Sequence, residues 1–353
     1  MSQTETATDT ATAPDSIDII GAPRIRGLGF RRYRGPVDHP EMVRVANLVG
    51  EADHDPEVRT VEGITSHYAH LTNCDPYEDS LVVEVGDRMV AYSRVEWEDQ
   101  TNGGRSYFSF GFIDPAWRRK GIGRVMLRWN ERRLRAIAAG HVHDRPRWFG
   151  SWGNDINVGN QALLLAEGYV SVRHFYEMVR ADLNVLPNVA LPDGFEIRPI
   201  VNDADIRRVF AADGEAFRDH WGGVDESEEA YLRWTTSPTF DPSLLIVAWD
   251  GDEVAAGIIN GIDPVTNERR GIQRGWLESV FTRRAWRRRG LARALIARSL
   301  ALLRERGMTS ASLGVDASNP HEAFRLYEDS GFIKGDGGTS FRKAFDPVVG
   351  PEW

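Results

Sequence analysis

Apolar residues recur along this chain in two patterns that alternate. Residues 107–113 and 276–282 have the β-branched and aromatic content that half-buried strands favour. In residues 125–137, and again from Leu291 to Leu303, apolar side chains return mostly every three or four positions, which is typical of an amphipathic helix. The pattern therefore predicts a strand followed by a long helix at two places in the chain.

A short basic turn that contains glycine joins strand to helix in the second of these places. It runs from Arg287 to Ala292, R-R-R-G-L-A. The first N–H groups of a helix have no partner within the helix, the helix dipole is positive there, and Gly290 lets an anion approach the backbone. The turn suits a phosphate or pyrophosphate group, although a solvated basic turn or part of a nucleic-acid patch would have the same composition.

The turn is repeated at a constant interval. Residues 117–124, W-R-R-K-G-I-G-R, share the pattern of residues 286–293, and two offsets agree (286 − 117 = 169 and 290 − 121 = 169). The elements predicted around each copy also agree, in the order β-α-β-β-β-α-β-α-β. The sequence therefore predicts an α/β fold of two tandem domains, each with a mixed central β-sheet flanked by helices.

The domain boundaries follow from composition. We expect a disordered tail over residues 1–22, because its first part is rich in Ser, Thr and Ala and poor in large apolar residues. A Pro-bearing, aperiodic stretch at residues 184–194 is predicted to link an N-terminal domain (23–183) to a C-terminal domain (195–353). Asp203 is expected to cap the first helix of the second domain.

Composition also limits the class of protein. Hydrophobic residues make up 41% and charged residues 27%, as in soluble globular domains, and no apolar run is long enough to span a membrane. A net charge of −9 argues against general binding to nucleic acid. Cys74 is the single cysteine and cannot form an internal disulfide, which indicates a reducing cytoplasm; we expect a packed or surface thiol and not a nucleophile.

Two kinds of motif resemble signatures of the GNAT superfamily of N-acetyltransferases. R-R-R-G-L-A at 287–292 and R-R-K-G-I-G at 118–123 resemble the family's acetyl-CoA-binding pattern R-x-x-G-x-G/A. N-P-H-E-A-F-R-L-Y-E-D-S-G-F at 319–332 resembles its second signature, N-x-x-x-A-x-x-L-Y-x-x-x-G-F. The resemblance covers nearly the whole chain as two tandem copies, and it implies two GNAT-like domains that use acetyl-CoA.

The resemblance also implies which residues hold acetyl-CoA. In the family the pantetheine arm pairs with a strand edge where two parallel strands separate, and the pyrophosphate lies on the basic turn. The implied residues of the C-terminal copy are Val280, Phe281, Thr282, Arg287, Arg288, Arg289, Gly290, Leu291, Ala292, Arg293 and Asn319. Those of the N-terminal copy are Arg118, Arg119, Lys120, Gly121, Ile122 and Gly123. Asn319 could instead be a helix cap ahead of Pro320.

The same resemblance implies two catalytic residues in the C-terminal copy. Tyr327 matches the family's tyrosine that protonates the leaving thiolate; the alternative is a tyrosine that packs its ring in the core. Glu278 lies on the strand before the turn, where many relatives carry an acidic base that acts directly or through water. The alternative for Glu278 is a surface carboxylate or a salt-bridge partner.

The N-terminal copy differs where the chemistry would occur. Counting back from the turn glycines (121 − 12 = 109; 290 − 12 = 278) places Ser109 opposite Glu278. Alignment of the glycines that end the last helix of each copy places Leu164 opposite Tyr327. Neither replacement can perform the same proton transfer, so we expect a catalytically degenerate domain with an intact phosphate turn.

The sequence does not identify the acceptor. Residues 217–236 lie where the family's variable acceptor loop falls: Asp219 and His220 could hold a cationic amine, with Trp221 as a cation–π wall, or the segment could be an ordinary loop. His220 has no companion at metal-ligand spacing, so no metal is expected.

We therefore expect a cytoplasmic, acetyl-CoA-dependent N-acetyltransferase of a small-molecule amine, monomeric or homodimeric, with no nucleic-acid or membrane partner. A non-enzymatic acyl-CoA-binding sensor and a peptide or protein N-acetyltransferase are the alternatives.

Overall fold

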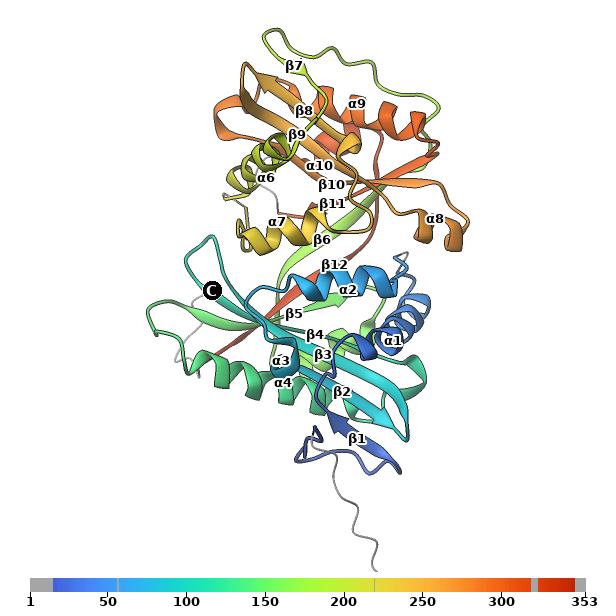
Figure 1. Cartoon of the computed structure of the whole chain (residues 1–353), viewed down its shortest axis with the longest axis vertical. Coiled ribbons are helices and arrows are strands. Elements are labelled where there is room, and N and C mark those ends of the chain that lie inside the picture. Colours follow the sequence, from blue (N-terminus) through green and yellow to red (C-terminus); the bar gives the residue numbers. More distant parts are fainter. Residues whose placement is uncertain (1–14, 56, 219, 319–322, 347–353) are drawn as a thin grey trace, which may run out of the picture.

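The computed structural model describes residues 15–346 except 56, 219 and 319–322. We call residues up to 183 the N-half and residues from 195 onward the C-half. Figure 1 shows the N-half below the C-half, each with helices packed against strands.

The two halves contain similar series of elements. The strands of the N-half are β1 (Leu28–Arg31), β2 (Ser80–Val85), β3 (Arg88–Asp99), β4 (Arg105–Ile113), β5 (Arg147–Asn154) and β6 (Val170–Arg180). Its helices are α1 (His39–Ala52), α2 (Val61–Ala69), α3 (Pro76–Asp79), α4 (Ile122–Ala138) and α5 (Val158–Ala166). The strands of the C-half are β7 (Glu196–Ile197), β8 (Leu245–Asp250), β9 (Glu253–Ile262), β10 (Arg274–Thr282), β11 (Ser310–Asp316) and β12 (Ile333–Ala344). Its helices are α6 (Asp203–Phe217), α7 (Glu228–Thr235), α8 (Pro264–Arg270), α9 (Leu291–Glu305) and α10 (Ala323–Asp329).

The strands join into one mixed sheet of 12 strands, in the order β1-β2-β3-β4-β5-β12-β6-β11-β10-β9-β8-β7. The pairs β4–β5 and β10–β11 are parallel and the other neighbours are antiparallel. The α/β class with mixed sheets flanked by helices, predicted from the repeat, is therefore confirmed.

The final strand of each half is exchanged. β6 of the N-half pairs with β11 of the C-half, and β12 of the C-half pairs with β5 of the N-half. The two exchanged strands also pair with each other at the centre of the sheet. In Figure 1, β12 (red) descends into the N-half beside β5, and β6 (green) rises toward the C-half. The division at residues 184–194 therefore separates the repeats in the sequence, but each half of the sheet is completed by a strand of the other.

The parallel pairs separate at their ends. β10 pairs with β11 only as far as Leu277 and Leu313, after which β10 remains bonded to β9 and β11 to β6. β4 and β5 separate in the same way after residues 109 and 151. Each half therefore has a wedge between two parallel strands, directly before its basic turn.

The long helix after each turn is amphipathic, as predicted. The buried residues of α9 include Leu291, Leu295, Leu300 and Leu303, which join Leu277 in the main core of the C-half. Burial of each such side chain contributes about 1.5–3 kcal/mol to folding. α4 packs on the N-half strands in the same way.

Several local predictions were wrong. The tail was expected to be disordered through residue 22, but Ser16 bridges to Arg31 and the Ile17 N–H donates to the Phe30 carbonyl at 2.8 Å. The cap of α6 is Asn202, whose side chain accepts from the N–H of residue 205, and not Asp203.

The segment expected to form an acceptor loop, residues 217–236, contains α7. No helix in the described part of the chain is long and apolar enough to cross a membrane.

Candidate functional site

The two basic turns have the same backbone conformation. In the C-half Arg288 (φ 63°) and Gly290 (φ 84°) are left-handed, and in the N-half Arg119 (φ 63°) and Gly121 (φ 88°) repeat these values. Each glycine is the N-cap of its helix, no side chain caps the helix, and no acidic residue lies in its first turn. Successive N–H groups in such a turn form a concave anion site, reinforced by the helix dipole.

The first arginine of each motif holds the turn in place. Arg287 donates from Nε to the Thr282 carbonyl (3.1 Å) and from Nη2 to the Ala216 carbonyl at the end of α6 (3.0 Å). Arg118 donates from Nε to the Ile113 carbonyl (3.4 Å) and makes a bidentate ion pair with Asp53 (2.6 and 2.8 Å). These two predicted phosphate ligands therefore tie the turn to the preceding strand and to the first helix of their half.

The other basic residues of the turns are more open. Arg288, Arg289 and Lys120 are exposed, and Lys120 lies 4.3 Å from the Trp117 ring centroid. Arg293 instead pairs with Asp329 at 2.8 Å. The side chains of Leu291 and Ile122 are buried in the cores, so at these positions only the backbone N–H could face a ligand.

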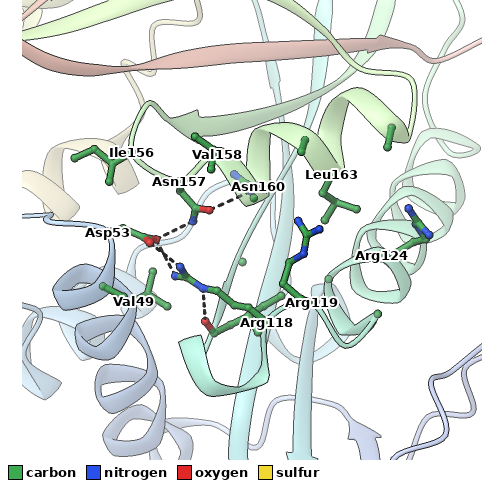
Figure 2. Close-up of a pocket in the computed structure, with 18 residues that line it drawn as sticks. Val49, Asp53, Arg118, Arg119, Arg124, Ile156, Asn157, Val158, Asn160 and Leu163 are labelled. Carbon is green, nitrogen blue, oxygen red and sulfur yellow. Dashed lines mark hydrogen bonds and ion pairs between the residues drawn. The ribbon is translucent and has the colours of Figure 1, made fainter.

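A pocket of about 740 Å³ lies at the turn of the N-half. Its walls are the end of α1, the end of β4, the turn with Arg119 and Gly121, and α5. Figure 2 shows the ion pair between Arg118 and Asp53, which also accepts from Asn157 Nδ2 at 2.7 Å. The intact turn predicted for the N-half is therefore accompanied by a cavity.

Glu278 lies at an irregularity in β10. The pairing of β10 with β9 shifts register between Leu277 and Ser279, which is a β-bulge at Glu278. The Glu278 side chain lies across Gly261 of β9, where a Cβ would collide with its carboxylate. The side chain is exposed, yet the surrounding protein partly desolvates the carboxylate and raises its pKa. No ion pair of Glu278 is found among the described residues.

A second carboxylate supports the bulge. Ser279 donates its hydroxyl hydrogen bond to Asp213 of α6, whose pKa is raised to about 6 by burial. This pair could not be predicted from the sequence, because nothing in the spacing of a helix and a strand 66 residues apart indicates their contact.

Tyr327 lies on α10 and is 7% exposed. Its ring packs in the C-half core with Phe332, at 6.2 Å between centroids. Burial raises its pKa to about 12, so the phenol is protonated at neutral pH. Its hydroxyl has no hydrogen-bond partner among the described residues.

The corresponding residues of the N-half belong to the core. Ser109 and Leu164 are both 1% exposed, and the Ser109 carbonyl accepts from the Ser151 hydroxyl at 2.9 Å. The pairing of β4 with β3 continues without a bulge from Ala91 to Asp99.

The predicted acceptor residues have partners in the protein. The centroids of the His220 and Phe217 rings lie 4.5 Å apart, with the rings tilted by 46°. Trp221 already has a cation near its ring, because the Arg342 guanidinium lies 4.5 Å from the ring centroid. Asp219, like the predicted cofactor ligand Asn319, lies outside the described residues.

One further feature of the turns was missed. Pro192 lies beside Gly290 and Pro23 beside Gly121, so that a Cβ added at each glycine would approach the proline ring to 3.8 Å and 3.6 Å, respectively. These prolines obey the same interval (192 − 23 = 169), so extending the repeat backwards would have found them.

Comparison with known proteins agrees with this geometry. Residues 207–332 match the acetyltransferase (GNAT) family. Mycothiol acetyltransferase of Thermomonospora curvata is 31% identical over 237 residues, which are 63% of this chain and 69% of the relative. Mycothiol acetyltransferase of Salinispora arenicola is 27% identical over 350 residues, which are 96% of each chain.

A GCN5-related N-acetyltransferase from Sphaerobacter thermophilus has a similar structure. Its TM-score is 0.68 at 25% identity, with 91% of this chain and 97% of that chain covered. The repeated turn, the wedges and these relatives together show that the chain belongs to the GNAT acetyltransferase family, in its tandem form, and is an acyltransferase.

Proposed function

We propose that the C-half transfers the acetyl group of acetyl-CoA to a primary amine of a small molecule, by direct attack in a ternary complex. The observation that carries this proposal is the arrangement along β10. Glu278 lies at the bulge where β10 leaves β11, and the anion-binding turn follows at the end of the same strand.

The chain offers a suitable surface for the cofactor. The N–H groups at the start of α9 would receive the pyrophosphate, with Arg288 and Arg289 adding charge. Beyond Leu277 β10 no longer pairs with β11, so Val280 and the N–H of Thr282, whose carbonyl accepts from Arg287, would pair with the pantetheine arm. Bound acetyl-CoA supplies the thioester carbonyl that the amine attacks.

Glu278 and Tyr327 would move the two protons. Glu278 would accept the proton that the attacking amine loses as its nitrogen bonds to the carbonyl carbon, and its raised pKa makes it a better base than an ordinary glutamate. Tyr327 would donate its phenolic proton to the sulfur as the carbon–sulfur bond breaks. The products are an N-acetyl amide and CoA.

The acceptor is proposed from the relatives' name and from the hairpin that β3 and β4 form in the N-half. The relatives are named mycothiol acetyltransferase, so the acetylation that this name describes is the first to test. Residues 220–222 of the acceptor segment are held by Thr101, whose N–H donates to the Gly222 carbonyl (2.8 Å) and whose hydroxyl donates to the His220 carbonyl (2.6 Å). We propose that this hairpin closes one side of a small-molecule site.

We also propose that the N-half holds CoA without catalysing transfer. Its turn and its 740 Å³ pocket favour binding, whereas Ser109 and Leu164 supply neither base nor acid.

Calorimetric titration of acetyl-CoA into Gly290→Asp and Gly290→Asn tests the assignment of the turn. Asp and Asn have the same shape and both tolerate the left-handed backbone, so the pair differs by one charge beside the pyrophosphate. We expect the Asp variant to bind at least tenfold more weakly than the Asn variant. Gly121→Asp and Gly121→Asn provide the matched comparison for the N-half.

Release of CoA with a panel of amines is measured on the same variants. If Gly290→Asp and Gly290→Asn bind acetyl-CoA with equal affinity and release CoA at equal rates, the C-half turn is not the cofactor site and the proposal fails. Loss of turnover with Gly121→Asp alone would show that the reaction belongs to the N-half and not to the C-half.

A further inference from the structure

A second cavity, of about 770 Å³, lies between the two halves and away from the basic turns. Its N-half walls come from residues 57–60, α2, β3 and β4, and its C-half walls from residues 237–239 and 263–265. α2 contacts α7 next to it, in the space between the halves in Figure 1. The cavity uses none of the residues assigned above to acetyl transfer.

An arginine is buried in the wall of this cavity. Arg94 of β3 is 3% exposed, and its guanidinium lies between the rings of Tyr68 (5.1 Å) and Phe110 (4.6 Å). Its Nη2 approaches His67 Nε2 at 3.3 Å and Glu96 at 3.2 Å. Its Nε and Nη1 have no hydrogen-bond partner within the described chain. Burying a guanidinium with unmet donors is costly, so an arginine here requires a reason.

The catalytic half has no arginine at the equivalent place. Phe110 pairs with Arg94 across β4 and β3, and 279 − 110 = 169 makes Ser279 the counterpart of Phe110. Ser279 pairs with Ile259, so Ile259 occupies the place in the C-half that Arg94 occupies in the N-half. An isoleucine therefore suffices for the fold at this point of the sheet, and the buried charge is specific to the N-half.

Neutral donors surround the arginine. Burial and the charges of Arg94 and Arg233 lower the pKa of His67 to about 4, so its imidazole is neutral at pH 7. Because Nε2 accepts from Arg94, the ring proton belongs on Nδ1, as a donor. Burial raises the pKa of the Tyr68 hydroxyl to about 12 and that of Tyr92 as well, so both remain protonated.

Most of the carboxylates that line the cavity, in contrast, already have ion-pair or hydrogen-bond partners in the protein. Glu96 pairs with Arg94, and Glu57 pairs with Arg59 at 3.0 Å. Asp263 accepts from the backbone N–H and the hydroxyl of Thr266 at 3.0 and 2.6 Å. Glu62 is exposed. Among the described residues, the buried polar atoms of the cavity wall without a partner are therefore hydrogen-bond donors, on Arg94 and Arg59.

We propose that this cavity is a binding site for a small organic carboxylate with an apolar body. Its carboxylate takes hydrogen bonds from Arg94 and the neutral donors beside it, since a guanidinium matches a carboxylate in charge and in the spacing of its N–H groups. Its apolar body lies against Phe110, Phe112, Ile64 and Val265. The site is separate from the proposed acetyl transfer, and its ligand is not acetylated there.

Titration of sodium benzoate into the full chain without acetyl-CoA tests the proposal. Benzyl alcohol and benzylamine are the controls, because they keep the ring and replace the anion by a neutral or a cationic group. We expect benzoate to bind at least tenfold more tightly than either. Arg94→Met should abolish this preference, whereas Arg207→Met, which removes an arginine from the exposed surface of α6, should keep it.

Val265→Trp provides a second variant in which Arg94 is retained. It fills the cavity from the C-half and should also weaken benzoate at least tenfold, so the proposal remains testable if Arg94→Met fails to fold. Equal binding of the three probes, a preference for benzylamine, or unchanged benzoate binding in both variants would overturn the proposal. Because no acetyl-CoA is present, an error in the proposed transfer reaction would leave these results unaltered.

Discussion

In the C-half the strand before the basic turn is interrupted by a bulge at Glu278, whereas the equivalent strand of the N-half pairs without a break past Ser109. The turns themselves agree in φ to within a few degrees. Anion binding depends on backbone N–H groups, which many sequences can supply. Proton transfer depends on particular side chains and on room for them. In the proposal made above, the C-half meets both requirements and the N-half meets only the first.

The two halves also use the space on the sheet differently. In the C-half Gly261 leaves room for the Glu278 side chain, and Ser279 beside the bulge is bonded to Asp213. In the N-half the buried Arg94 and its partner Glu96 lie on β3. Two copies of one fold can therefore differ in an acidic side chain and in a buried charge although their strands follow the same order.

The largest expected effect comes from the two proposed catalytic residues. Glu278→Gln and Tyr327→Phe should each lower the rate of acetyl transfer by about 10²–10⁴-fold, because each removes one proton transfer. Steady-state CoA release measures the rate, and calorimetry should show that acetyl-CoA still binds. Ser109→Ala is the matched change in the N-half and should leave the rate unaltered. An equal loss in Ser109→Ala would remove the distinction between the halves.

The next largest effect should be on stability, at the ion pair that holds the N-half turn. Asp53→Ala leaves the Arg118 charge without its carboxylate and removes the partner of Asn157, at an expected cost of about 3 kcal/mol. Urea unfolding measures the free energy of unfolding. A loss below about 1 kcal/mol would show that the ion pair of Asp53 contributes little to holding the N-half turn.

A smaller effect is expected from the glycine beneath Glu278. Gly261→Ala places a methyl group where the carboxylate lies, so Glu278 must move and kcat should fall by about tenfold, as for a misplaced catalytic group. Gly29→Ala is the control, because a Cβ at Gly29 has nothing within 4 Å. Unchanged kcat in Gly261→Ala would argue that Glu278 does not act from this position.

The smallest expected effect concerns Asp213. Its pKa of about 6 lies above the ordinary value of 3.8, so the folded protein holds this proton more tightly than the unfolded chain. Stability contributed by the protonated form is therefore present below about pH 4 and is lost as pH rises toward 6. Asp213→Asn keeps an oxygen for Ser279 and should remove this slope, gaining about 1–2 kcal/mol relative to wild type by pH 7. Parallel pH profiles for the two proteins would contradict the assignment.

The repeat, the two turns and the long helices could be predicted from the sequence because each depends on local patterns. A glycine at Gly290 and Gly121 allows the left-handed backbone, and the spacing of Leu291, Leu295 and Leu303 sets one face of a helix. The family motifs identified the wedge, and they predicted Glu278 and Tyr327 as candidates.

The tertiary structure alone decided the exchange of β6 and β12, the Ser279–Asp213 support and the cavity between the halves. Two successive repeats have nearly the same strand pattern, so either final strand satisfies either sheet edge, and local propensity cannot distinguish the pairings. The role of Arg118 was likewise hidden, because its partner Asp53 lies 65 residues earlier in the chain. Contacts between distant segments depend on packing of the whole sheet, which no local pattern encodes.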